Sequence, residues 1–314
     1  APSRGLGDVY KRQVLVRDIG IGFDAGEEET PWYGSVEKED LDRFLTRTPM
    51  GNKGTFGKVL VLAGSGAMCG AAVLCARAVL ASGAGMVKVV TEERNRTPLF
   101  CALPEAMADF WKEDEPLPEE ALLQDLVWAD AVVAGPGLSK SRTAKELLVF
   151  TVQHTEVPLV LDADALNIIS QDLELLKKHR GEVTVTPHLG EMSRLTDIAI
   201  PDIKKNILRV CKDFAMEYNV IDVLKDSRTC VSRGGDIYIN TSGNNGMSTA
   251  GAGDVLAGVI TGLIATGSSP YEAAKLGVYI HGLCGDITAR ELSARGMTVA
   301  DMTELLGALM SEFE

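Results

Sequence analysis

KVLVLAGSGAMCGAAVLCARAVLASGAGMVKVVT, residues 58–91, is the stretch that decides the fold class. It begins with a short apolar run at 58–63, continues through an alanine-rich segment of helical length at 71–82, and ends with a second apolar run at 86–91. Two short apolar runs separated by a helical segment are typical of a β–α–β unit, in which the two strands are parallel. The stretch therefore predicts an α/β fold built on a parallel sheet.

The same alternation of apolar runs and helical segments continues toward the C-terminus. We expect further strands at 131–134, 159–161, 183–186 and 220–224, helices at 142–154 and 201–218, and a hairpin with strands at 229–232 and 236–240. Two helices are expected to begin near Asp254 and Pro270, followed by a final amphipathic helix at 300–310. The sequence thus predicts a mostly parallel central sheet with helices on both faces.

The N-terminal part of the chain has a different character. Residues 1–13 show no apolar period, and we interpret them as a disordered or foreign leader. Residues 14–21 form an apolar run that predicts a short strand, and the acidic segment 35–45 favours an early helical turn. Because Pro49 cannot continue a helix, we place a domain boundary at residue 48.

The amino-acid composition limits the kinds of molecule that this chain can bind as its main partner. The chain has 314 residues, 46% of them hydrophobic, and a net charge of −13. A strongly acidic chain disfavours nucleic acid or an anionic membrane as the main partner, since both require a basic face. It still allows anionic small molecules, which a few backbone amides and one lysine can bind. The six cysteines form no CxxC pair and no secretory signal precedes them, so we expect reduced thiols in a cytoplasmic protein.

The strongest chemical signal is NTSGNNGMSTAGAGD, residues 240–254, which precedes an apolar helical segment. Four glycines let successive backbone N–H groups converge on one point, and the N-terminus of the following helix adds positive potential. This pattern predicts an anion hole for a phosphate, with Asp254 placed to act as a base on a nearby hydroxyl. The alternative is a tight glycine loop in which Asp254 only caps the helix.

Two glycine turns follow other expected strands. Gly64 and Gly66 precede Ala71 at a helix start, but their spacing is not the GxGxxG of dinucleotide-binding folds. These small residues allow close packing either on a ligand or on the sheet. The turn that contains Gly135 and Gly137 is equally consistent with a ligand contact and with a plain turn.

Polar residues follow three more of the expected strands. Asp162 and Asp164 can hold Mg²⁺ through water or bond a hydroxyl, or Asp164 can cap a helix. His188 can contact a substrate, although a single histidine is more often structural. The segment KDSRT at 225–229 carries two cations and two hydroxyls, which suits a nucleotide phosphate but also a simple hairpin. No zinc-ligand spacing and no Walker A motif occur in the sequence.

Taken together, the motifs resemble a known family, the ADP- or ATP-dependent NAD(P)H-hydrate dehydratases of the ribokinase-like superfamily. The matching stretches are KGTFGKVLVLAGS, GAAVLCARAVLASGAGMVKVVT, AGPGL, LDADALN, TPHLGE, GNNGMSTAGAGDVLAGVITGL and YIHGLCGD, in the family's order. The resemblance implies a three-layer α/β/α sandwich for residues 48–314. It also implies that residues 14–47 are the remnant of a preceding epimerase domain plus a linker, as in bifunctional members.

The resemblance further implies a repair reaction on the S-form of hydrated NADH or NADPH (NADHX, NADPHX). ADP or ATP phosphorylates the ring hydroxyl, and loss of phosphate restores the double bond, leaving AMP or ADP. Asp254 is the implied base, and the amides of Ala252 and Gly253 steady the phosphoryl group. The implied contacts of the hydrate are Ala71, Gly137, His188 and Asp254, and those of the nucleotide are Lys225, Asp226, Ser227, Arg228, Thr229 and Gly253. Mg²⁺ is expected between the phosphates, with no residue assigned as its ligand.

Three residues depart from the family pattern. Leu189 replaces the second proline of TPHPGE, Asp226 replaces the glycine of KGxxT, and Asn52 stands where a histidine usually precedes KG. A carboxylate at position 226 would repel phosphates unless it points away or meets a cation. These departures concern the affinity for the nucleotide and the choice between ADP and ATP.

Two other functional classes use the same residues. One is a ribokinase-like kinase of a small hydroxylated vitamin precursor, which would release a stable phosphorylated product. The other is a non-catalytic nucleotide-binding module, in which Asp254 would be dispensable. The resemblance also implies a homotetramer and an epimerase partner, fused or separate.

Overall fold

In the computed structural model, residues 33–34 and 50–311 are described, and their strands form one ten-stranded sheet. The strands are β1 (Tyr33–Gly34), β2 (Lys58–Leu62), β3 (Met86–Glu92), β4 (Met107–Trp111), β5 (Ala131–Ala134), β6 (Leu159–Leu161), β7 (Val183–Val185), β8 (Ile221–Leu224), β9 (Cys230–Ser232) and β10 (Ile237–Ile239). Their spatial order is β1-β10-β9-β8-β7-β6-β5-β2-β3-β4. All neighbours from β8 to β4 are parallel, and β9 is antiparallel to β8 and β10. The prediction of a mostly parallel sheet is confirmed.

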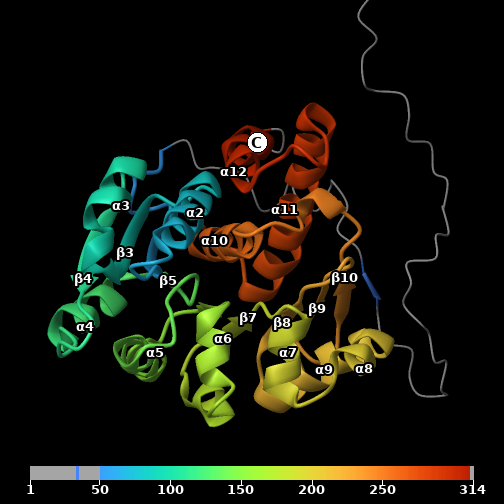
Figure 1. Cartoon of the computed structure of the whole chain (residues 1–314), viewed down its shortest axis with the longest axis horizontal. Helices are drawn as coiled ribbons and strands as arrows, with labels where there is room; N and C mark the ends of the chain where they lie inside the picture. Colours follow the sequence, from blue (N-terminus) through green and yellow to red (C-terminus); the bar gives the residue numbers. More distant parts are fainter. Residues whose placement is uncertain (1–32, 35–49, 312–314) are drawn as a thin grey trace, which may run out of the picture.

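Helices cover both faces of this sheet, which gives the expected three layers (Figure 1). One layer contains α2 (Cys69–Ala81), α3 (Arg96–Ala102), α10 (Ala252–Ala265), α11 (Pro270–Leu292) and α12 (Val299–Met310). The other contains α4 (Glu119–Trp128), α5 (Arg142–His154), α6 (Asp164–Ile169), α7 (Leu189–Thr196), α8 (Ile200–Lys205) and α9 (Ile207–Tyr218). None of the helices in the described part of the chain is both long and apolar enough to cross a membrane.

The alternation of side chains along β2 explains why its sequence is a continuous apolar run. Val59 and Val61 belong to the core beneath the α2–α10–α11–α12 layer, whereas Leu60 and Leu62 belong to the core beneath the α4–α9 layer. Successive side chains of a strand point to opposite faces, and both faces are covered here. The run that identified the strand in the sequence therefore fills two separate cores.

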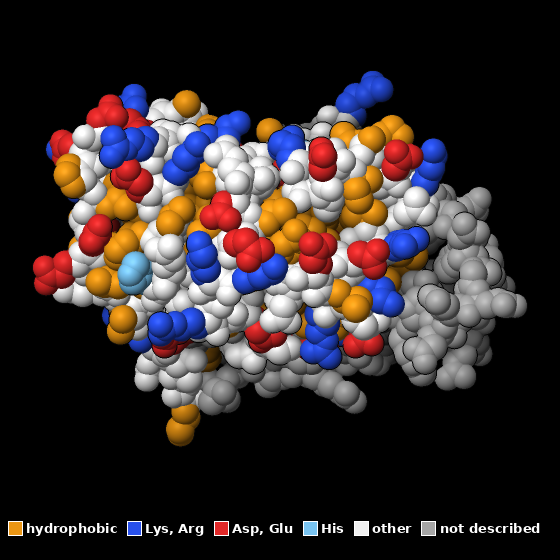
Figure 2. All heavy atoms as spheres, turned by 90° about the horizontal axis from the view of Figure 1, so that it is seen from below, with side chains coloured by type: hydrophobic (Ala, Val, Ile, Leu, Met, Phe, Trp, Pro, Cys, Tyr) orange, Lys and Arg blue, Asp and Glu red, His pale blue; other side chains and the backbone are white. Residues whose placement is uncertain are grey.

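Figure 2 shows the outer face of the second helical layer, where apolar side chains lie among charged ones. A groove of about 730 Å³ is formed there by residues of α7, α8 and α9 and the end of α6. Its lining includes Leu195, Phe214 and Tyr218, together with Arg194, Arg209 and Asp213. The groove thus combines aromatic surface with charges of both signs.

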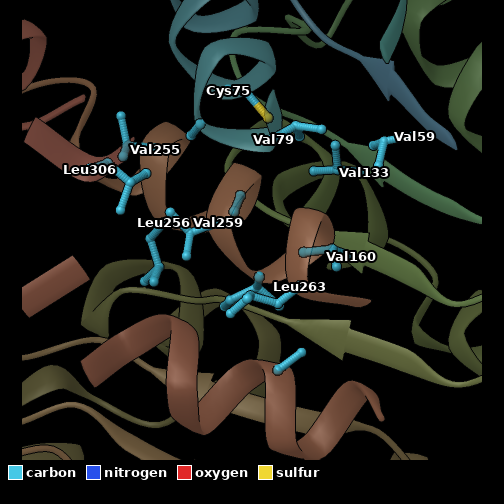
Figure 3. Packing of buried hydrophobic residues seen from close by; sticks show 14 of the residues in the cluster. Val59, Cys75, Val79, Val133, Val160, Val255, Leu256, Val259, Leu263 and Leu306 are labelled. Atoms are coloured by element: carbon cyan, nitrogen blue, oxygen red, sulfur yellow. The ribbon is translucent and has the colours of Figure 1, made fainter. Parts of the chain in front are cut away.

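Helix α10 lies at the centre of the first layer and packs closely on α2. Figure 3 shows Val255, Val259 and Leu263 of α10 among the buried side chains around Cys75 and Val79 of α2. A Cβ atom added at Gly258 would lie 2.3 Å from the carbonyl oxygen of Cys75. Glycine is therefore required at this helix crossing, and the crossing fixes where α10 begins.

We expect Gly258→Ala to lower the free energy of unfolding by about 1–3 kcal/mol, because an extra methyl group must push two packed helices apart. Denaturant-induced unfolding measures this change. Gly307→Ala in α12 is the matched control: no atom lies within 4 Å of its added Cβ, and the residue is exposed. That control should raise stability by about 0.5–1 kcal/mol through helix propensity. Equal effects of the two substitutions would contradict the packing argument.

The predicted strands and helices from residue 58 onward are present within two residues of the expected bounds, with one exception. The segment 201–218, expected as one helix, is divided into α8 and α9 at Asn206, whose φ of −132° and ψ of 33° are not helical. The Asn206 side chain donates to the carbonyl of Asp202 and so competes with the helical hydrogen bonds. The leader 1–13, the strand at 14–21, the turn at 35–45 and the boundary at 48 lie outside the described residues.

Candidate active site

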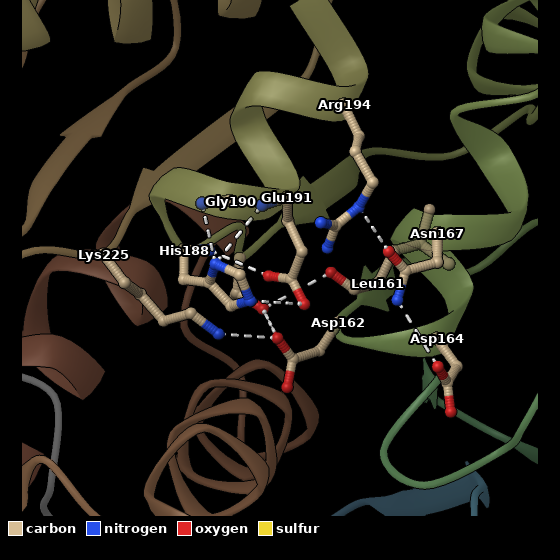
Figure 4. Close-up of polar contacts among 10 residues, drawn as sticks. Leu161, Asp162, Asp164, Asn167, His188, Gly190, Glu191, Arg194 and Lys225 are labelled. Carbon is tan, nitrogen blue, oxygen red and sulfur yellow. Dashed lines mark hydrogen bonds and ion pairs between the residues drawn. The ribbon is translucent and has the colours of Figure 1, made fainter. Parts of the chain in front are cut away.

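Three neighbouring strands bring polar side chains together at the carboxyl edge of the sheet (Figure 4). Asp162 follows β6, Thr186 follows β7 and Lys225 follows β8. Lys225 Nζ lies 2.8 Å from Asp162 Oδ1, and Thr186 Oγ1 donates to the same oxygen at 2.7 Å. Ligands of open α/β sheets bind at this edge, so the cluster occupies the position expected for an active site.

The first turn of α10 faces this cluster. A Cβ atom added at Gly253 would lie 3.2 Å from Lys225 Nζ and 3.6 Å from Asp162 Oδ2. The N-cap of α10 is Gly251, at φ +93°, and within the described part of the chain no side chain caps the helix. The N-terminus of a helix without a side-chain cap attracts an anion through its amides and its dipole, and the ammonium group adds a full positive charge. This place can therefore bind a phosphoryl group.

Asp254 is the third residue of α10 and does not cap it, which excludes the structural alternative for this residue. Burial, together with the nearby charge of Asp162, raises the pKa of the Asp254 carboxyl to about 7, against the opposing charge of Lys225. A carboxyl group that titrates near neutral pH can accept a proton and release it again. Asp254 therefore has the ionisation expected of a general base.

His188 and Glu191 form a capping box at the start of α7. His188 Nδ1 accepts from the amides of Gly190 at 2.9 Å and Glu191 at 3.2 Å, and Glu191 Oε2 accepts from the His188 amide at 2.8 Å. Because Nδ1 is an acceptor, the neutral ring carries its proton on Nε2. The His188 side chain is 55% exposed, so the ring is within reach of a ligand.

Glu191 is a buried carboxyl group that sequence reasoning assigned only to the start of a helix. Burial raises its pKa to about 7, against the opposing charge of Lys225. Its Oε1 lies 3.4 Å from His188 Nε2. Lys225 therefore faces three carboxyl groups, those of Asp162, Glu191 and Asp254.

A second series of hydrogen bonds runs along the edge of the site through Asp164. Asp164 Oδ2 accepts from the amide of Ser139 at 2.8 Å, and Asn167 Nδ2 lies 3.4 Å from Asp164 Oδ1. Arg194 Nε donates to Asn167 Oδ1 at 2.8 Å (Figure 4). The alternative in which Asp164 caps α6 is wrong, because the N-cap is Ala163 and no side chain makes a capping bond there. Asp164 instead ties the start of α6 to the loop that carries Ser139.

The two glycine turns predicted from the sequence lie against each other. A Cβ atom added at Gly137, whose φ is +58°, would lie 2.8 Å from the Cβ of Ala71. The amide of Gly64 donates to the carbonyl of Pro136 at 2.8 Å. A Cβ atom at Gly135 would lie 1.8 Å from the carbonyl oxygen of Asp162, so this turn also packs against the end of β6. Small residues are thus required to bring these loops to the site.

The segment 225–229 divides into two parts. Lys225 turns toward Asp162, whereas Asp226 and Ser227 are exposed in the turn between β8 and β9. Arg228 NH1 donates to the carbonyl of Thr241 at 3.0 Å, and Asn240 donates to the carbonyl of Thr229. The exposed position of Asp226 leaves its carboxylate in solvent, where repulsion of a phosphate is weak.

Among the described residues, no group of three or more His, Cys, Asp or Glu side chains is arranged to hold a metal ion. The sequence suggests Asp162 and Asp164 as a pair of magnesium ligands, but their carboxylates have separate partners. Asp162 pairs with Lys225, and Asp164 accepts from the amide of Ser139.

Comparison with known proteins gives a consistent set of matches. A family described as NAD(P)H-hydrate dehydratase matches residues 59–307. The bifunctional NAD(P)H-hydrate repair enzyme Nnr of Moorella thermoacetica is 36% identical over 277 residues, which cover 85% of this chain and 52% of that protein. The chain thus spans about half the length of this relative. The ADP-dependent (S)-NAD(P)H-hydrate dehydratase of Bacillus subtilis is 32% identical, with 84% and 92% covered.

A solved structure supports the same grouping. The crystal structure of ADP/ATP-dependent NAD(P)H-hydrate dehydratase from Bacillus subtilis, co-crystallised with ATP/Mg²⁺, superimposes with a TM-score of 0.76 at 30% identity. The match covers 88% of this chain and 98% of that one. The likeness extends over the sheet and both helical layers.

Proposed function

Because the chain belongs to the NAD(P)H-hydrate dehydratase family, we propose that its site removes water from the S-form of hydrated NADH or NADPH at the expense of ADP or ATP. The observation that supports this proposal most strongly is that three groups lie close together. They are the Lys225 ammonium, the N-terminus of α10, which has no side-chain cap, and the Asp254 carboxyl, whose pKa is about 7. These are the three elements that phosphoryl transfer to a hydroxyl requires: a cation, an anion hole and a base.

In the proposed first step, Asp254 takes the proton of the ring hydroxyl, and the hydroxyl oxygen attacks the terminal phosphorus of the nucleotide. The bond from that phosphorus to the bridging oxygen breaks, so that ADP leaves as AMP or ATP leaves as ADP. Lys225 Nζ and the amides of Ala252 and Gly253 stabilise the negative charge that develops on the phosphoryl oxygens.

In the second step, the carbon–oxygen bond of the phosphorylated ring breaks and phosphate leaves with the bonding electrons. Loss of a proton from the neighbouring ring carbon then restores the double bond. Phosphate is a far better leaving group than hydroxide, which explains why a dehydration consumes a nucleotide. A Mg²⁺ ion bound with the nucleotide would supply neutralisation of the phosphate charge.

The contacts of the two substrates follow from the loops around this centre. We propose that Ala71, Gly137 and the Nε2–H of His188 contact the hydrated ring and its dinucleotide. The turn of Asp226, Ser227, Arg228 and Thr229 contacts the adenine nucleotide. The close approach of Ala71 to Gly137 and the exposure of the His188 side chain support this division.

Turnover of chemically prepared NADH hydrate tests the proposal directly. With Mg²⁺ and ADP or ATP we expect recovery of the near-ultraviolet absorbance of NADH, with one phosphate released per hydrate consumed. Without nucleotide we expect no enzyme-dependent recovery. A stable phosphorylated product would instead favour a kinase, and binding of nucleotide without any turnover would favour a non-catalytic module.

The pH dependence of kcat/KM gives a second test. Asp254 must be unprotonated to act as a base, and its pKa is raised to about 7. We therefore expect kcat/KM to fall tenfold per pH unit below about pH 7 and to level off above it. Glu191→Gln shows which carboxyl group causes this fall at low pH, the acid limb of the profile. The acid limb should persist in this variant, because Glu191 is not the proposed base. Loss of the limb in Glu191→Gln would reassign the titration to Glu191.

We further propose that the protein works as a cytoplasmic homotetramer with an epimerase domain, for which residues 14–47 are the remnant and linker. The bifunctional relatives support the epimerase partner. Six free cysteines, four of them buried, are typical of a protein from a reducing compartment. Light scattering at micromolar concentration tests the assembly, and a monomer would contradict it.

A further inference from the structure

Asp162 is a buried residue whose place in the fold leaves it little freedom. Its amide donates to the carbonyl of Ala134 at 3.1 Å, and its own carbonyl accepts from the amide of Ala165 at 3.0 Å. The carbonyl oxygen also lies against Gly135, where no Cβ can fit. Only 2% of the Asp162 side chain is exposed. A buried carboxylate is stable only when it is paired, so its partners are essential to the site.

Both partners of the carboxylate come from neighbouring strand ends and meet at one oxygen. Lys225 Nζ lies 2.8 Å from Oδ1, and Thr186 Oγ1 donates to Oδ1 at 2.7 Å. The hydroxyl bond fixes the rotation of the carboxylate, and the ion pair fixes the end of a long, flexible lysine side chain. The ammonium group is thereby held beside Gly253, at the first turn of α10.

We propose that Asp162 is a positioning residue of the reaction, whose carboxylate holds the Lys225 ammonium where the transferring phosphoryl group binds. The proposal rests on the function proposed above. Asp162 acts through Lys225, since its bonded oxygen is occupied by Lys225 and Thr186. Lys225 also faces Glu191 and Asp254, so without Asp162 the ammonium would no longer be held at one place between those two carboxyl groups.

The same carboxylate shapes the charge around Asp254. The charged groups that face Asp254 are Asp162 and Asp164 at the end of β6, Glu191 of α7 and Lys225 after β8. The neutral thiol of Cys75, on α2, is buried on the same side. After burial, Asp162 is the largest cause of the raised pKa of Asp254. Removing its charge should therefore lower that pKa.

Asp162→Asn is the central experiment, because asparagine keeps the shape and the acceptor oxygen but loses the charge. We expect kcat to fall about 10- to 100-fold, as for loss of one preorganised charge contact, with little change in KM for the hydrate. The acid limb of kcat/KM should move to lower pH, since Asp254 then ionises more easily. A residue with a purely structural role would not move this limb.

Two matched variants separate geometry from charge. Thr186→Val removes the hydroxyl donor and keeps every charge, so we expect a smaller fall in kcat and an unshifted acid limb. Asp172→Asn removes a carboxylate that is 53% exposed and 4.0 Å from Lys178, and it should change neither kcat nor the limb. Wild-type kcat and limb position in Asp162→Asn would overturn the proposal. A raised Mg²⁺ requirement in that variant would overturn it in favour of a metal-binding role.

A binding measurement distinguishes this proposal from the proposed reaction. Calorimetry of the wild-type protein should show that ADP binds more tightly than AMP, since the extra phosphate contacts Lys225. Asp162→Asn should lose most of that difference. This measurement needs no turnover. If the wild-type protein fails to dehydrate NADH hydrate but the difference in affinity between ADP and AMP still depends on Asp162, the proposed reaction is wrong and the positioning role of Asp162 is supported. An unchanged difference overturns the positioning role.

Discussion

Asp254→Asn should lower kcat by about 10³- to 10⁴-fold while the affinity for ADP stays within a few-fold of the wild-type value. The amide cannot accept the hydroxyl proton, whereas a well-placed general base contributes up to about 10⁴-fold. The nucleotide contacts proposed for Lys225 and the α10 amides would remain in place. Steady-state turnover of NADH hydrate and calorimetric binding of ADP measure the two quantities.

The control for Asp254→Asn is Asp172→Asn, which removes one exposed carboxylate outside the site. It should keep wild-type turnover. If Asp254→Asn retains more than a tenth of the wild-type kcat, Asp254 is not the base. The remaining near-neutral carboxyl group of the cluster, Glu191, would then be the next candidate.

Lys225→Met should have the second large effect, and it should affect both turnover and stability. Loss of a charge that stabilises the phosphoryl oxygens predicts a fall in kcat/KM of about 10²- to 10³-fold. Methionine also leaves Asp162 buried without its cationic partner, and breaking such a pair typically costs about 3–5 kcal/mol. Kinetics and denaturant unfolding on the same preparation measure the two effects.

Two further lysine variants make the second prediction specific. Lys225→Arg keeps the charge, so it should restore most of the stability, but it should restore less of the turnover because the planar guanidinium presents its donors differently. Lys205→Met removes an exposed lysine whose partner is Asp202, and neither quantity should change. Equal turnover in Lys225→Met and the wild-type protein would remove Lys225 from the reaction.

The sequence predicts best those helices and strands that have a distinctive local composition. The apolar runs of β2 and β3 and the small residues before α10 predicted those elements within two residues, because buried strands and glycine loops have a distinctive composition. The edge strand β4 was missed. Four of its five side chains are only partly buried or exposed, so it has no continuous apolar run.

The sequence predicts which strand ends carry the residues of the candidate site, but it does not predict which of those residues contact each other. Asp162 and Lys225 each follow a predicted strand, yet their ion pair depends on β6, β7 and β8 being neighbours, and chain separation does not reveal that order. His188 was considered as a substrate contact. Its second role as a helix cap was not predictable, since Ser, Thr, Asp and Asn are the usual caps.

The glycine crossing of α10 and α2 has a consequence for motion during turnover. Gly258 lies against the backbone of α2, and Gly262 likewise lies 2.8 Å, measured from its added Cβ, from the carbonyl oxygen of Val79. A helix held by backbone contacts at successive turns cannot slide or rotate without opening both crossings. We therefore expect α10, which carries the proposed base Asp254, to keep its position on α2 when ligands bind, so that any adjustment falls to the loops that carry Gly137 and Asp226.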